Sequence, residues 1–321
     1  MDEPWYSSVS ADLNEVERLM EDVIRSGNQE LTEICSYVLC SNGKRIRPSM
    51  CLLSFRVCGG KDPAKAIEAA TAIEVIHNAT LIHDDINDQG ELRRGAQAAY
   101  KRYSIGKSIV AGDFMFAIGF RLIGSASDEV VDYIVSASTA MSAGEFDQKE
   151  FEHNPDVTEE DYMKIIQGKT ARLIECGAKI GSFLAGAGSE TLGKVAEFAY
   201  RTGISFQIVD DMLDVIGDER STGKRIGSDI MEGKPTLPMI YAMQDAAYGG
   251  RIRELFTRDD LEWSEVSEVI ELIKKTDAIS RCRKKAKEIA EGSAVFLDGI
   301  GDSEYKRSMI ALSDYIVSRD R

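Results

Sequence analysis

Apolar residues recur at every third or fourth position through most of the chain, which is the spacing of amphipathic α-helices. The clearest series follows Asp62-Pro63, an N-cap residue with proline at the first helical position, and consists of Ile67, Ala70, Ile73, Ile76, Ala79 and Ile82. Thr158 with Asp161 predicts a second helix start through a capping box, and Ser127-Asp128-Glu129 predicts an acid-rich first turn. We expect the first of these helices to end in the acidic stretch that begins at Asp84.

Signals for strands are scarce, because no run of alternating apolar and polar residues is closed by a two-residue turn. The most apolar region, residues 105–124, contains Lys107, Asp113 and Arg121, which favours a buried helix over a membrane span. Beyond about residue 245 the pattern predicts only generic amphipathic helices, such as 263–273. No long linker or low-complexity segment divides the chain. We therefore predict an all-α protein in which residues 1–321 form a single helical domain.

The charge balance narrows the classes of partner. The 54 acidic and 39 basic residues give a formal net charge of −15, which disfavours binding to nucleic acid or to an anionic membrane. The first residues carry no basic segment followed by an apolar one, so we expect no signal peptide and a cytoplasmic location. The cysteines show no close pairing and are expected to be free, buried thiols rather than disulfides or a zinc site; they are Cys35, Cys40, Cys51, Cys58, Cys176 and Cys282.

Two acidic clusters carry the candidate chemistry. The segments 84–88 and 210–214 both have the pattern D-D-x-x-D, which in a helix places the first and last aspartates one turn apart on the same face. Each cluster follows a strongly apolar stretch, and like charges at that spacing are unfavourable unless cations lie between them. Two clusters of this kind predict magnesium sites with carboxylate ligands. Magnesium usually bridges a few carboxylates to substrate phosphates, so the substrate should be a phosphate ester.

Compact basic groups could complete the neutralisation of such a substrate. They are Lys44, Arg45 and Arg47 in a Gly-Lys-Arg-Ile-Arg-Pro segment, Arg93 and Arg94, Lys169, Lys224 and Arg225, and Lys234. In the first group the neighbouring Gly43 and Pro48 favour an ordered loop that clasps an anion, with bidentate contacts from arginine. The basic run 281–287 has no acidic cluster or glycine loop beside it, and we interpret it as a solvated face.

Taken together, these motifs resemble the trans-isoprenyl diphosphate synthases, also called polyprenyl synthetases, over roughly residues 40 to 240. The matching segments are 43–48, Glu74 with His77, 81–85, 93–95, 112–113, 169–170, 206–211 and 233–238. The resemblance implies an antiparallel helix bundle around a deep central cavity, usually as a homodimer. It also implies a transferase that joins an allylic prenyl diphosphate to isopentenyl diphosphate and releases diphosphate.

The resemblance also implies roles for individual residues. Three magnesium ions would be bound by Asp84, Asp85, Asp88, Asp210 and Asp214. The allylic diphosphate would be held with the help of Arg93, Lys169, Lys224 and Lys234. Isopentenyl diphosphate would occupy a metal-free site made of Gly43, Lys44, Arg47, His77 and Arg94. His83 is expected to be structural.

The expected mechanism follows the charge as it develops. When the allylic carbon–oxygen bond ionises at the site of Asp84 and Asp210, magnesium and lysine stabilise the leaving diphosphate more in the transition state than before it. The Lys169 carbonyl, the Thr170 hydroxyl and the Gln207 amide are expected to stabilise the allylic cation, while exclusion of water prevents its hydrolysis. The isopentenyl double bond then attacks, and the resemblance implies that the released diphosphate removes the proton.

Product length depends on the helix that leads into Asp84. Short-chain relatives usually place an aromatic residue four or five positions before the first aspartate, whereas this chain has the small residues Thr80 and Ala79. One and two turns deeper stand Ile76 and Ile73, which we expect to form a later floor, since an isoprene unit is about as long as a helical turn of roughly 5 Å. We therefore predict a medium-length all-trans product of about C25 to C30, with a geranylgeranyl or longer product as the alternative.

Three other interpretations of the sequence fit the motifs less well. A class I terpene cyclase has one diphosphate substrate and needs no second cationic site. A non-catalytic prenyl-diphosphate-binding subunit typically loses aspartates, yet both clusters are intact here. A helical scaffold with acidic surface patches would tolerate asparagine at these positions. Two departures from the family pattern stand out: residues 96–100 lack the usual proline and threonine, and Gly144-Glu145 stands where many members have Gly-Gln.

Overall fold

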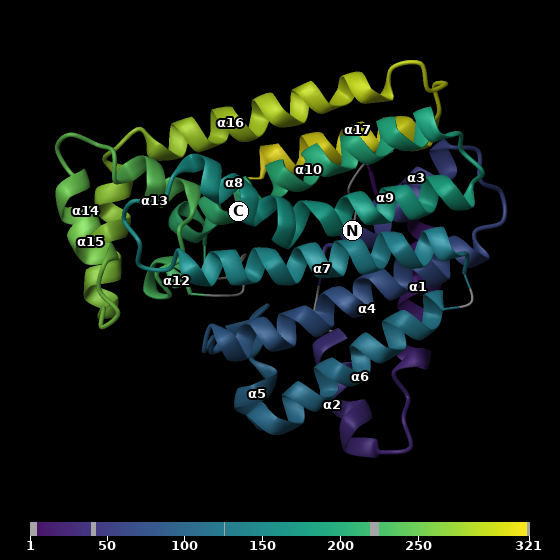
Figure 1. The fold of residues 1–321 in the computed structure, drawn as a ribbon, viewed down its shortest axis with the longest axis horizontal. Helices are drawn as coiled ribbons and strands as arrows, with labels where there is room; N and C mark the ends of the chain where they lie inside the picture. The colour runs from purple at the N-terminus through teal and green to yellow at the C-terminus, as the bar shows by residue number, and fades with distance from the viewer. Residues whose placement is uncertain (1–4, 40–42, 125, 219–224, 320–321) are drawn as a thin grey trace. The chain divides into compact units, whose positions relative to one another are not determined.

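The computed structural model describes residues 5–39, 43–124, 126–218 and 225–319 and is almost entirely helical (Figure 1). The all-α prediction is confirmed. The structure divides into two compact units, which are described separately below. Unit 1 comprises residues 1–136, 173–199 and 296–312, and unit 2 comprises residues 137–172, 200–295 and 313–321. The single domain expected from the sequence stays a prediction.

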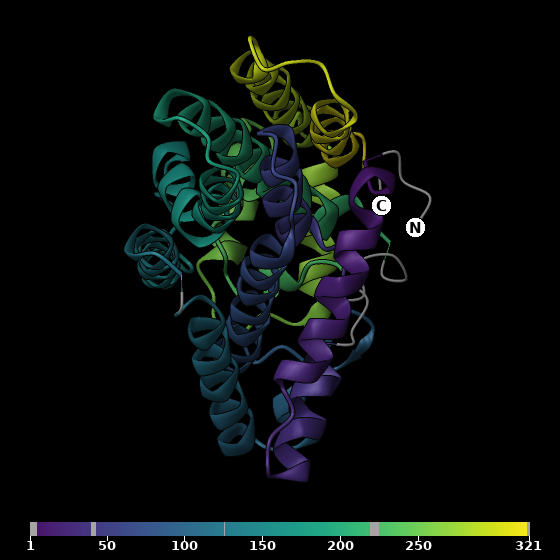
Figure 2. The same cartoon turned by 90° about the vertical axis from the view of Figure 1, so that its right-hand side faces the viewer.

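In unit 1 the long helix α4 (Ala64–Asn87) packs against α1 (Ser10–Val23), α3 (Ile46–Val57) and α6 (Ile105–Ile123), as Figures 1 and 2 show. The other elements that lie within this unit are η1 (Ser7–Val9), α2 (Gln29–Leu39), β1 (Leu92–Arg93), β2 (Ala96–Gln97) and α5 (Ala99–Arg102). Alanine and isoleucine cover almost every face of α4, and a helix that is apolar all round is a buried one. This burial holds the acidic end of α4 in a defined place.

Unit 2 is built around one apolar cluster that includes Tyr162, Ile208, Leu237 and Phe256. Its own helices are α8 (Glu159–Ile166), the π-helical turn η2 (Gln167–Ala171), α12 (Ser228–Met231), α13 (Leu237–Ala242), α14 (Gly249–Phe256), α15 (Trp263–Lys274) and α16 (Ala278–Ser293). The boundary between the units falls within or beside the remaining elements, namely α7 (Asp128–Glu150), α9 (Arg172–Leu184), α10 (Ser189–Ile216), η3 (Ala294–Leu297) and α17 (Glu304–Ser318).

The predicted helix starts agree with the structure to within about a residue. The capping box of Thr158 and Asp161 is present, and the acid-rich first turn of α7 begins at Asp128. In α4 the N-cap position is Pro63 rather than Asp62, although the Asp62 carboxylate still accepts a hydrogen bond from the Ala64 amide at 3.2 Å. The helix predicted at 263–273 is α15.

Two expectations need correction. Helix α6, expected to be buried, exposes a row of apolar side chains on one side, namely Ile105, Ile109, Val110 and Phe120. The chain also contains a small β-hairpin, in which β1 and β2 pair antiparallel with Leu92 opposite Gln97.

Within the described part of the chain, none of the helices combines the length and the apolar content that crossing a membrane requires. The five described cysteines are free thiols, and Cys40 lies outside the described residues.

Candidate active site

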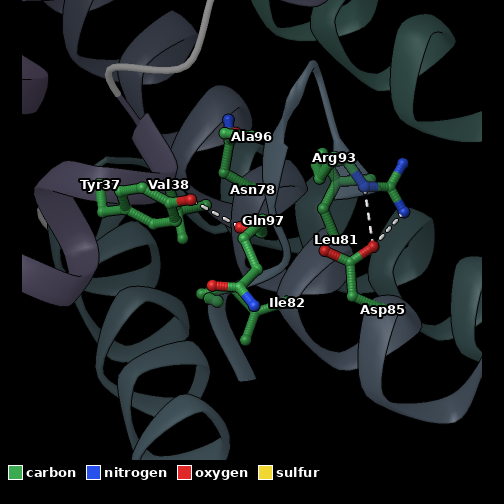
Figure 3. Close-up of a pocket in the computed structure, with 10 residues that line it drawn as sticks. Tyr37, Val38, Asn78, Leu81, Ile82, Asp85, Arg93, Ala96 and Gln97 are labelled. Carbon is green, nitrogen blue, oxygen red and sulfur yellow. Dashed lines mark hydrogen bonds and ion pairs between the residues drawn. The ribbon is translucent and has the colours of Figure 1, made fainter. Parts of the chain in front are cut away.

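The first acidic motif lies at the carboxyl end of α4 in unit 1. Asp84 and Asp88 are partly exposed and lie one turn apart, with the Asp88 amide donating to the Asp84 carbonyl at 2.8 Å. Asp85 is only 5% exposed and turns toward the hairpin, where the Arg93 Nε donates to its Oδ1 at 2.8 Å and Arg93 Nη2 pairs with the same oxygen (Figure 3). The motif therefore presents two partly exposed carboxylates and one that holds an arginine.

The hairpin places one arginine, Arg93, at the end of β1 and the next, Arg94, within its tight turn. Arg94 and Gly95 have φ values of 51° and 79°, the left-handed conformations that a two-residue type I′ hairpin loop requires. The hairpin is tied to α2 by the Tyr37 hydroxyl, which donates to the Gln97 carbonyl at 2.6 Å (Figure 3). A cavity of about 20 Å³ lies beneath it and is lined by residues that include Leu81, Ile82, Asn78 and Ala96. Arg93 consequently turns toward the acidic motif while Arg94 lies in different surroundings.

Those surroundings are the cationic cluster, which we define as Gly43, Lys44, Arg47, His77 and Arg94. A side chain at Gly43 would lie 3.2 Å from the Arg94 guanidinium, so the absence of one allows the loop and the hairpin to meet. Burial, together with the charges of Arg47, Arg94, Arg93 and Arg45, holds the pKa of His77 well below its ordinary value of 6.5. The structure thus brings the predicted isopentenyl diphosphate residues into one part of unit 1, with the imidazole neutral.

The sequence analysis grouped Arg45 with the cations that could neutralise the substrate and missed its role in supporting this cluster. Arg45 lies at the N-terminal end of α3 with a left-handed φ of 52°, and its guanidinium is 7% exposed. It donates to Glu17 at 2.5 Å and to the buried Glu74 at 2.8 Å. Glu74 in turn accepts from Asn78 Nδ2 at 3.3 Å, and the Asn78 Oδ1 accepts from Arg94 at 3.4 Å. This buried network connects four parts of unit 1, namely the loop that precedes α3, helix α1, helix α4 and the hairpin.

The second acidic motif lies on α10 in unit 2. The Asp210 side chain is 44% exposed and accepts a contact of 3.4 Å from Arg319, whose own side chain is only 8% exposed. Asp214 is buried, and its two oxygens accept from the Ser228 hydroxyl at 2.9 Å and the Asp229 amide at 3.0 Å, at the start of α12. Asp214 therefore anchors α12 in this structure, and its predicted role as a metal ligand stays a prediction.

Asp211 is 6% exposed and is the centre of a hydrogen-bonded chain. The Tyr162 hydroxyl donates to its Oδ2 at 2.7 Å, and the Gln207 Nε2 donates to its Oδ1 at 2.7 Å. The Thr170 hydroxyl then donates to the Gln207 Oε1 at 2.7 Å. Burial and the charges of Asp229 and Asp210 raise the pKa of Asp211 to about 7, against the lowering effect of the hydrogen bonds from Tyr162 and Gln207.

Lys169 lies in η2, and π-helical turns of this kind are frequent at functional sites. Its ammonium group lies 2.5 Å from the Glu145 carboxylate and 3.2 Å from the Gln148 Oε1. A side chain at Gly144 would lie 2.7 Å from the Lys169 backbone nitrogen, so the glycine lets α7 approach η2 closely. Lys234 lies 2.5 Å from Glu232, and Lys224 lies outside the described residues.

The side chains expected to limit product length are packed within unit 1. Ile76 and Ile73 are fully buried, and Ala79 is buried between them and the acidic motif. A Cβ at Gly119 of α6 would lie 2.4 Å from Ile76, so Ile76 occupies the space above that glycine. The Thr80 hydroxyl donates to the His77 carbonyl at 2.7 Å. Their effect on product length stays a prediction.

The donor set was tested against the expected magnesium. Within residues 5–39, 43–124, 126–218 and 225–319, no three histidine, cysteine or acidic side chains gather as a group that could hold a metal ion. The partly exposed carboxylates of Asp84, Asp88 and Asp210 are nevertheless the oxygen ligands that magnesium takes. Magnesium keeps several waters and uses substrate phosphates, so a pair of carboxylates is sufficient on the protein side. The residues therefore fit the ion.

Comparison with known proteins decides the family. The family model described as polyprenyl synthetase matches residues 28–273, which is most of the chain. The chain belongs to the polyprenyl synthetase family. It is a prenyl diphosphate synthase, and thus a prenyltransferase. The resemblance inferred from the motifs is confirmed.

Individual relatives agree in fold and differ in the length of their products. An all-trans-nonaprenyl-diphosphate synthase (geranyl-diphosphate specific) from Rhodobacter capsulatus is 34% identical over 97% of this chain and 96% of that protein. A short chain isoprenyl diphosphate synthase from Methanothermobacter thermautotrophicus is 33% identical over 95% of each. A polyprenyl synthase from Caulobacter crescentus CB15, complexed with calcium and isoprenyl diphosphate, superimposes with a TM-score of 0.95 at 29% identity, covering 99% of this chain and 98% of that one. The all-α isoprenoid synthase fold is thereby confirmed, and overall identity does not reveal product length.

Proposed function

We propose that this polyprenyl synthetase condenses an allylic prenyl diphosphate with isopentenyl diphosphate and releases diphosphate, in a magnesium-dependent reaction. One observation carries the proposal. The two arginines of a single hairpin serve different surroundings, because Arg93 pairs with Asp85 in the acidic motif and Arg94 lies against Gly43 in the cationic cluster. An enzyme with two diphosphate substrates needs two such anion sites, one with metal and one without.

Magnesium would be held by Asp84 and Asp88 in the first motif and by Asp210 in the second, and the family resemblance suggests three ions. The calcium and isoprenyl diphosphate in the Caulobacter relative support a divalent ion and a prenyl diphosphate ligand. When bound, the ion supplies Lewis-acid stabilisation of the charge on the departing diphosphate. Asp85 and Asp214, which are buried and already hydrogen-bonded, would instead hold Arg93 and α12 in place.

The remaining roles belong to the chain's own side chains. Arg93, Lys169 and Lys234 would bind the allylic diphosphate, and their fixed positive charges favour the transition state because negative charge accumulates on the leaving group there. Lys169 is oriented by Glu145 and Gln148. Thr170 and Gln207 would present oxygen atoms to the allylic cation without trapping it. The released diphosphate would take the proton, so no protein base is required.

The second substrate, isopentenyl diphosphate, would bind at the cationic cluster. Arg47 and Arg94 can each form two parallel hydrogen bonds to a phosphate, and Lys44 adds a third positive charge. The low pKa of His77 keeps the imidazole neutral, so it would contribute a hydrogen bond rather than charge. The cluster needs no metal because its own cations neutralise the ligand.

We propose a product of about C25 to C30. The support is that Ala79 and Thr80 leave room where short-chain relatives carry an aromatic residue, whereas Ile76 is fully buried against Gly119 one turn deeper. Each helical turn of about 5 Å corresponds to roughly one isoprene unit. Geranylgeranyl and longer products are the alternatives that the first experiment separates.

A homodimer is supported by the exposed row on α6. Ile105, Ile109, Val110 and Phe120 are 53%, 41%, 58% and 38% exposed, and Ile105, Ile109 and Phe120 recur at helical spacing on one face, with Val110 beside them. Large apolar side chains gathered in this way mark protein interfaces. The free thiols support a reducing compartment such as the cytoplasm.

Incubation with magnesium, labelled isopentenyl diphosphate and a geranyl, farnesyl or geranylgeranyl primer, followed by chromatographic sizing of the products, tests the proposal. We expect an acyclic ladder that ends near C25 or C30. A ladder that ends at C20 or passes C35 would preserve the reaction and refute the floor at Ile76. A cyclic hydrocarbon, or no product with any primer, would contradict the reaction itself.

A further inference from the structure

Asp211 is the second aspartate of its motif, yet its surroundings are unlike those of a metal ligand. Both oxygens are occupied by buried hydrogen-bond donors, the Tyr162 hydroxyl on Oδ2 and the Gln207 amide on Oδ1, each at 2.7 Å. Tyr162 is 2% exposed and belongs to the apolar core of unit 2. Tyr162 therefore holds the Asp211 carboxylate from the side of the apolar core, and the carboxylate in turn determines how the Gln207 amide is oriented.

The orientation follows from which atoms can donate. The Gln207 Nε2 donates to the Asp211 Oδ1, and an amide NH₂ group can only donate, so this end of the amide is held at the carboxyl group. The Gln207 Oε1 consequently faces Thr170, whose hydroxyl donates to it at 2.7 Å. Because a threonine hydroxyl has one proton, the remaining valences of the Thr170 oxygen are lone pairs. The chain of bonds thus turns the oxygen end of the Gln207 amide, rather than its NH₂ group, toward Thr170.

We propose that Asp211 is a positioning residue that acts through Gln207: the Tyr162–Asp211–Gln207–Thr170 relay fixes the Gln207 and Thr170 oxygens toward the developing allylic cation. This inference rests on the proposed function. Without Asp211, the Gln207 amide could rotate by half a turn and present its NH₂ group toward the Thr170 side. The positive end of the amide dipole would then oppose formation of the cation, and the chemical step would slow while substrate binding is kept.

Tyr162→Phe is the mildest test, and the chain offers a matched control. Tyr241, also buried in unit 2, donates at the same distance of 2.7 Å to the Glu159 carboxylate rather than to Asp211. We expect Tyr162→Phe to lower kcat roughly three- to tenfold, the size of one ordinary hydrogen bond. The KM for both diphosphates and the half-saturating magnesium concentration should stay within about twofold. Tyr241→Phe should behave like the unmodified protein. Equal behaviour of the two variants would overturn the proposal.

A double-mutant cycle tests whether Asp211 acts through Gln207. We expect Asp211→Leu and Gln207→Leu each to lower kcat, and the double variant to be no slower than Gln207→Leu alone. Asp211→Asn, which can still accept from the Gln207 amide, should recover most of the kcat that Asp211→Leu loses. Additive losses would overturn the relay, as would a large rise in the magnesium requirement of Asp211→Asn, because such a rise would identify Asp211 as a ligand.

Failure of the relay and failure of the proposed function give different results. If the unmodified protein forms condensation product and Tyr162→Phe is fully active, only the relay is refuted. If the unmodified protein forms no condensation product with any primer, the proposed function is refuted, and the role given to the relay is refuted with it.

Discussion

The two acidic motifs share one pattern, yet the protein uses two different means to bury the second aspartate of each. In unit 1 Asp85 is paired with a full positive charge, the Arg93 guanidinium. In unit 2 Asp211 has only neutral donors, Tyr162 and Gln207, whose hydrogen bonds do not offset burial and the charges of Asp229 and Asp210, so the pKa of its carboxyl is raised to about 7. Identical spacing therefore specifies which carboxylates share a helix face, while the tertiary partners decide what each one does.

Substitution of the first aspartate of each motif should impair the magnesium-dependent activity far more than substitution of the second aspartate. We expect Asp84→Asn or Asp210→Asn to lower kcat/KM by roughly 1000-fold or more, since removing a ligand charge weakens stabilisation worth several kcal/mol. Steady-state rates measured across a magnesium titration check this. Asp85→Asn should keep its half-saturating magnesium concentration within about threefold, and Asp314→Asn, at an exposed position of α17, is the inert control. Equal magnesium dependence of Asp84→Asn and Asp85→Asn would contradict the distinction.

The cationic cluster depends on the buried ion pair between Arg45 and Glu74. The described contacts of the second motif include no ion pair that is buried on both sides. Arg45→Met should lower the free energy of unfolding by about 3–5 kcal/mol, because it leaves Glu74 buried without its charge partner. Lys107→Met is the matched control, since its pair with Glu30 is half exposed on both sides and should change stability by less than about 1 kcal/mol. Urea unfolding of the two variants makes the comparison. A loss of less than 1 kcal/mol in Arg45→Met would show that the network does not support the cluster.

Product length can be moved in both directions from a single contact. Ile76→Ala should lengthen the main product by one or more isoprene units, since it opens the space above Gly119. Gly119→Ala places a methyl group 2.4 Å from the present Ile76 position, which forces the isoleucine to shift and should shorten the product. Chromatographic sizing of both products is the measurement. Unchanged lengths in two folded, active variants would place the floor elsewhere.

Acid should destabilise the first region through His77. The pKa of His77 in the folded protein lies well below its unfolded value near 6.5, so the folded state binds this proton less tightly than the unfolded chain. The contribution of the neutral imidazole is complete above pH 6.5 and is lost as the pH falls below it. Thermal melting between pH 7.5 and 5 should show a shallower decline for His77→Asn than for the unmodified protein. If the melting temperatures of both proteins declined in parallel, the low pKa assigned to the buried His77 beside its arginines would be contradicted.

The smallest expected effect concerns Arg319, which contacts Asp210 at 3.4 Å and lies over the Phe206 ring. An arginine in this position competes with a cation for the carboxylate. We expect Arg319→Gln to tighten magnesium binding by the substrate-free protein about two- to fivefold, as measured by calorimetry, because an exposed or partly exposed pair is worth about 1 kcal/mol or less. Weaker binding in the variant would show that Arg319 does not compete.

Local patterns predicted much of the fold. The start of α4, the capping box at Thr158 and the first turn of α7 depend on neighbouring residues, so the sequence contains their signals. The hairpin was not predicted, because two-residue strands are too short to alternate and its Arg94-Gly95 turn lacks the usual Asn-Gly or Asp-Gly signal. The exposed face of α6 was also missed, since apolar content alone does not distinguish a core from an interface.

For the candidate site, too, the residues within short motifs could be identified from the sequence, whereas their partners in distant segments could not. Residue type and helical spacing identified both acidic motifs, and the family resemblance indicated the residues of the cationic cluster. Their partners could not be predicted, because Arg45 meets Glu17 and Glu74 across 28 and 29 residues and Tyr162 meets Asp211 across 49. Burial of Asp85, Asp211 and Asp214 likewise depends on elements remote in sequence. The sequence pattern identifies the carboxylates, whereas tertiary packing determines how far each is buried and which hydrogen-bond partners it has.

The central claim is that the protein has one diphosphate site that needs metal and one that does not. Calorimetric titration with isopentenyl diphosphate and, separately, with a non-ionising allylic thiodiphosphate tests this claim directly, each in magnesium and in EDTA. We predict that isopentenyl diphosphate binds with similar affinity in both buffers and that the allylic analogue loses its binding in EDTA. Loss of both ligands in EDTA, or retention of both, would contradict the account.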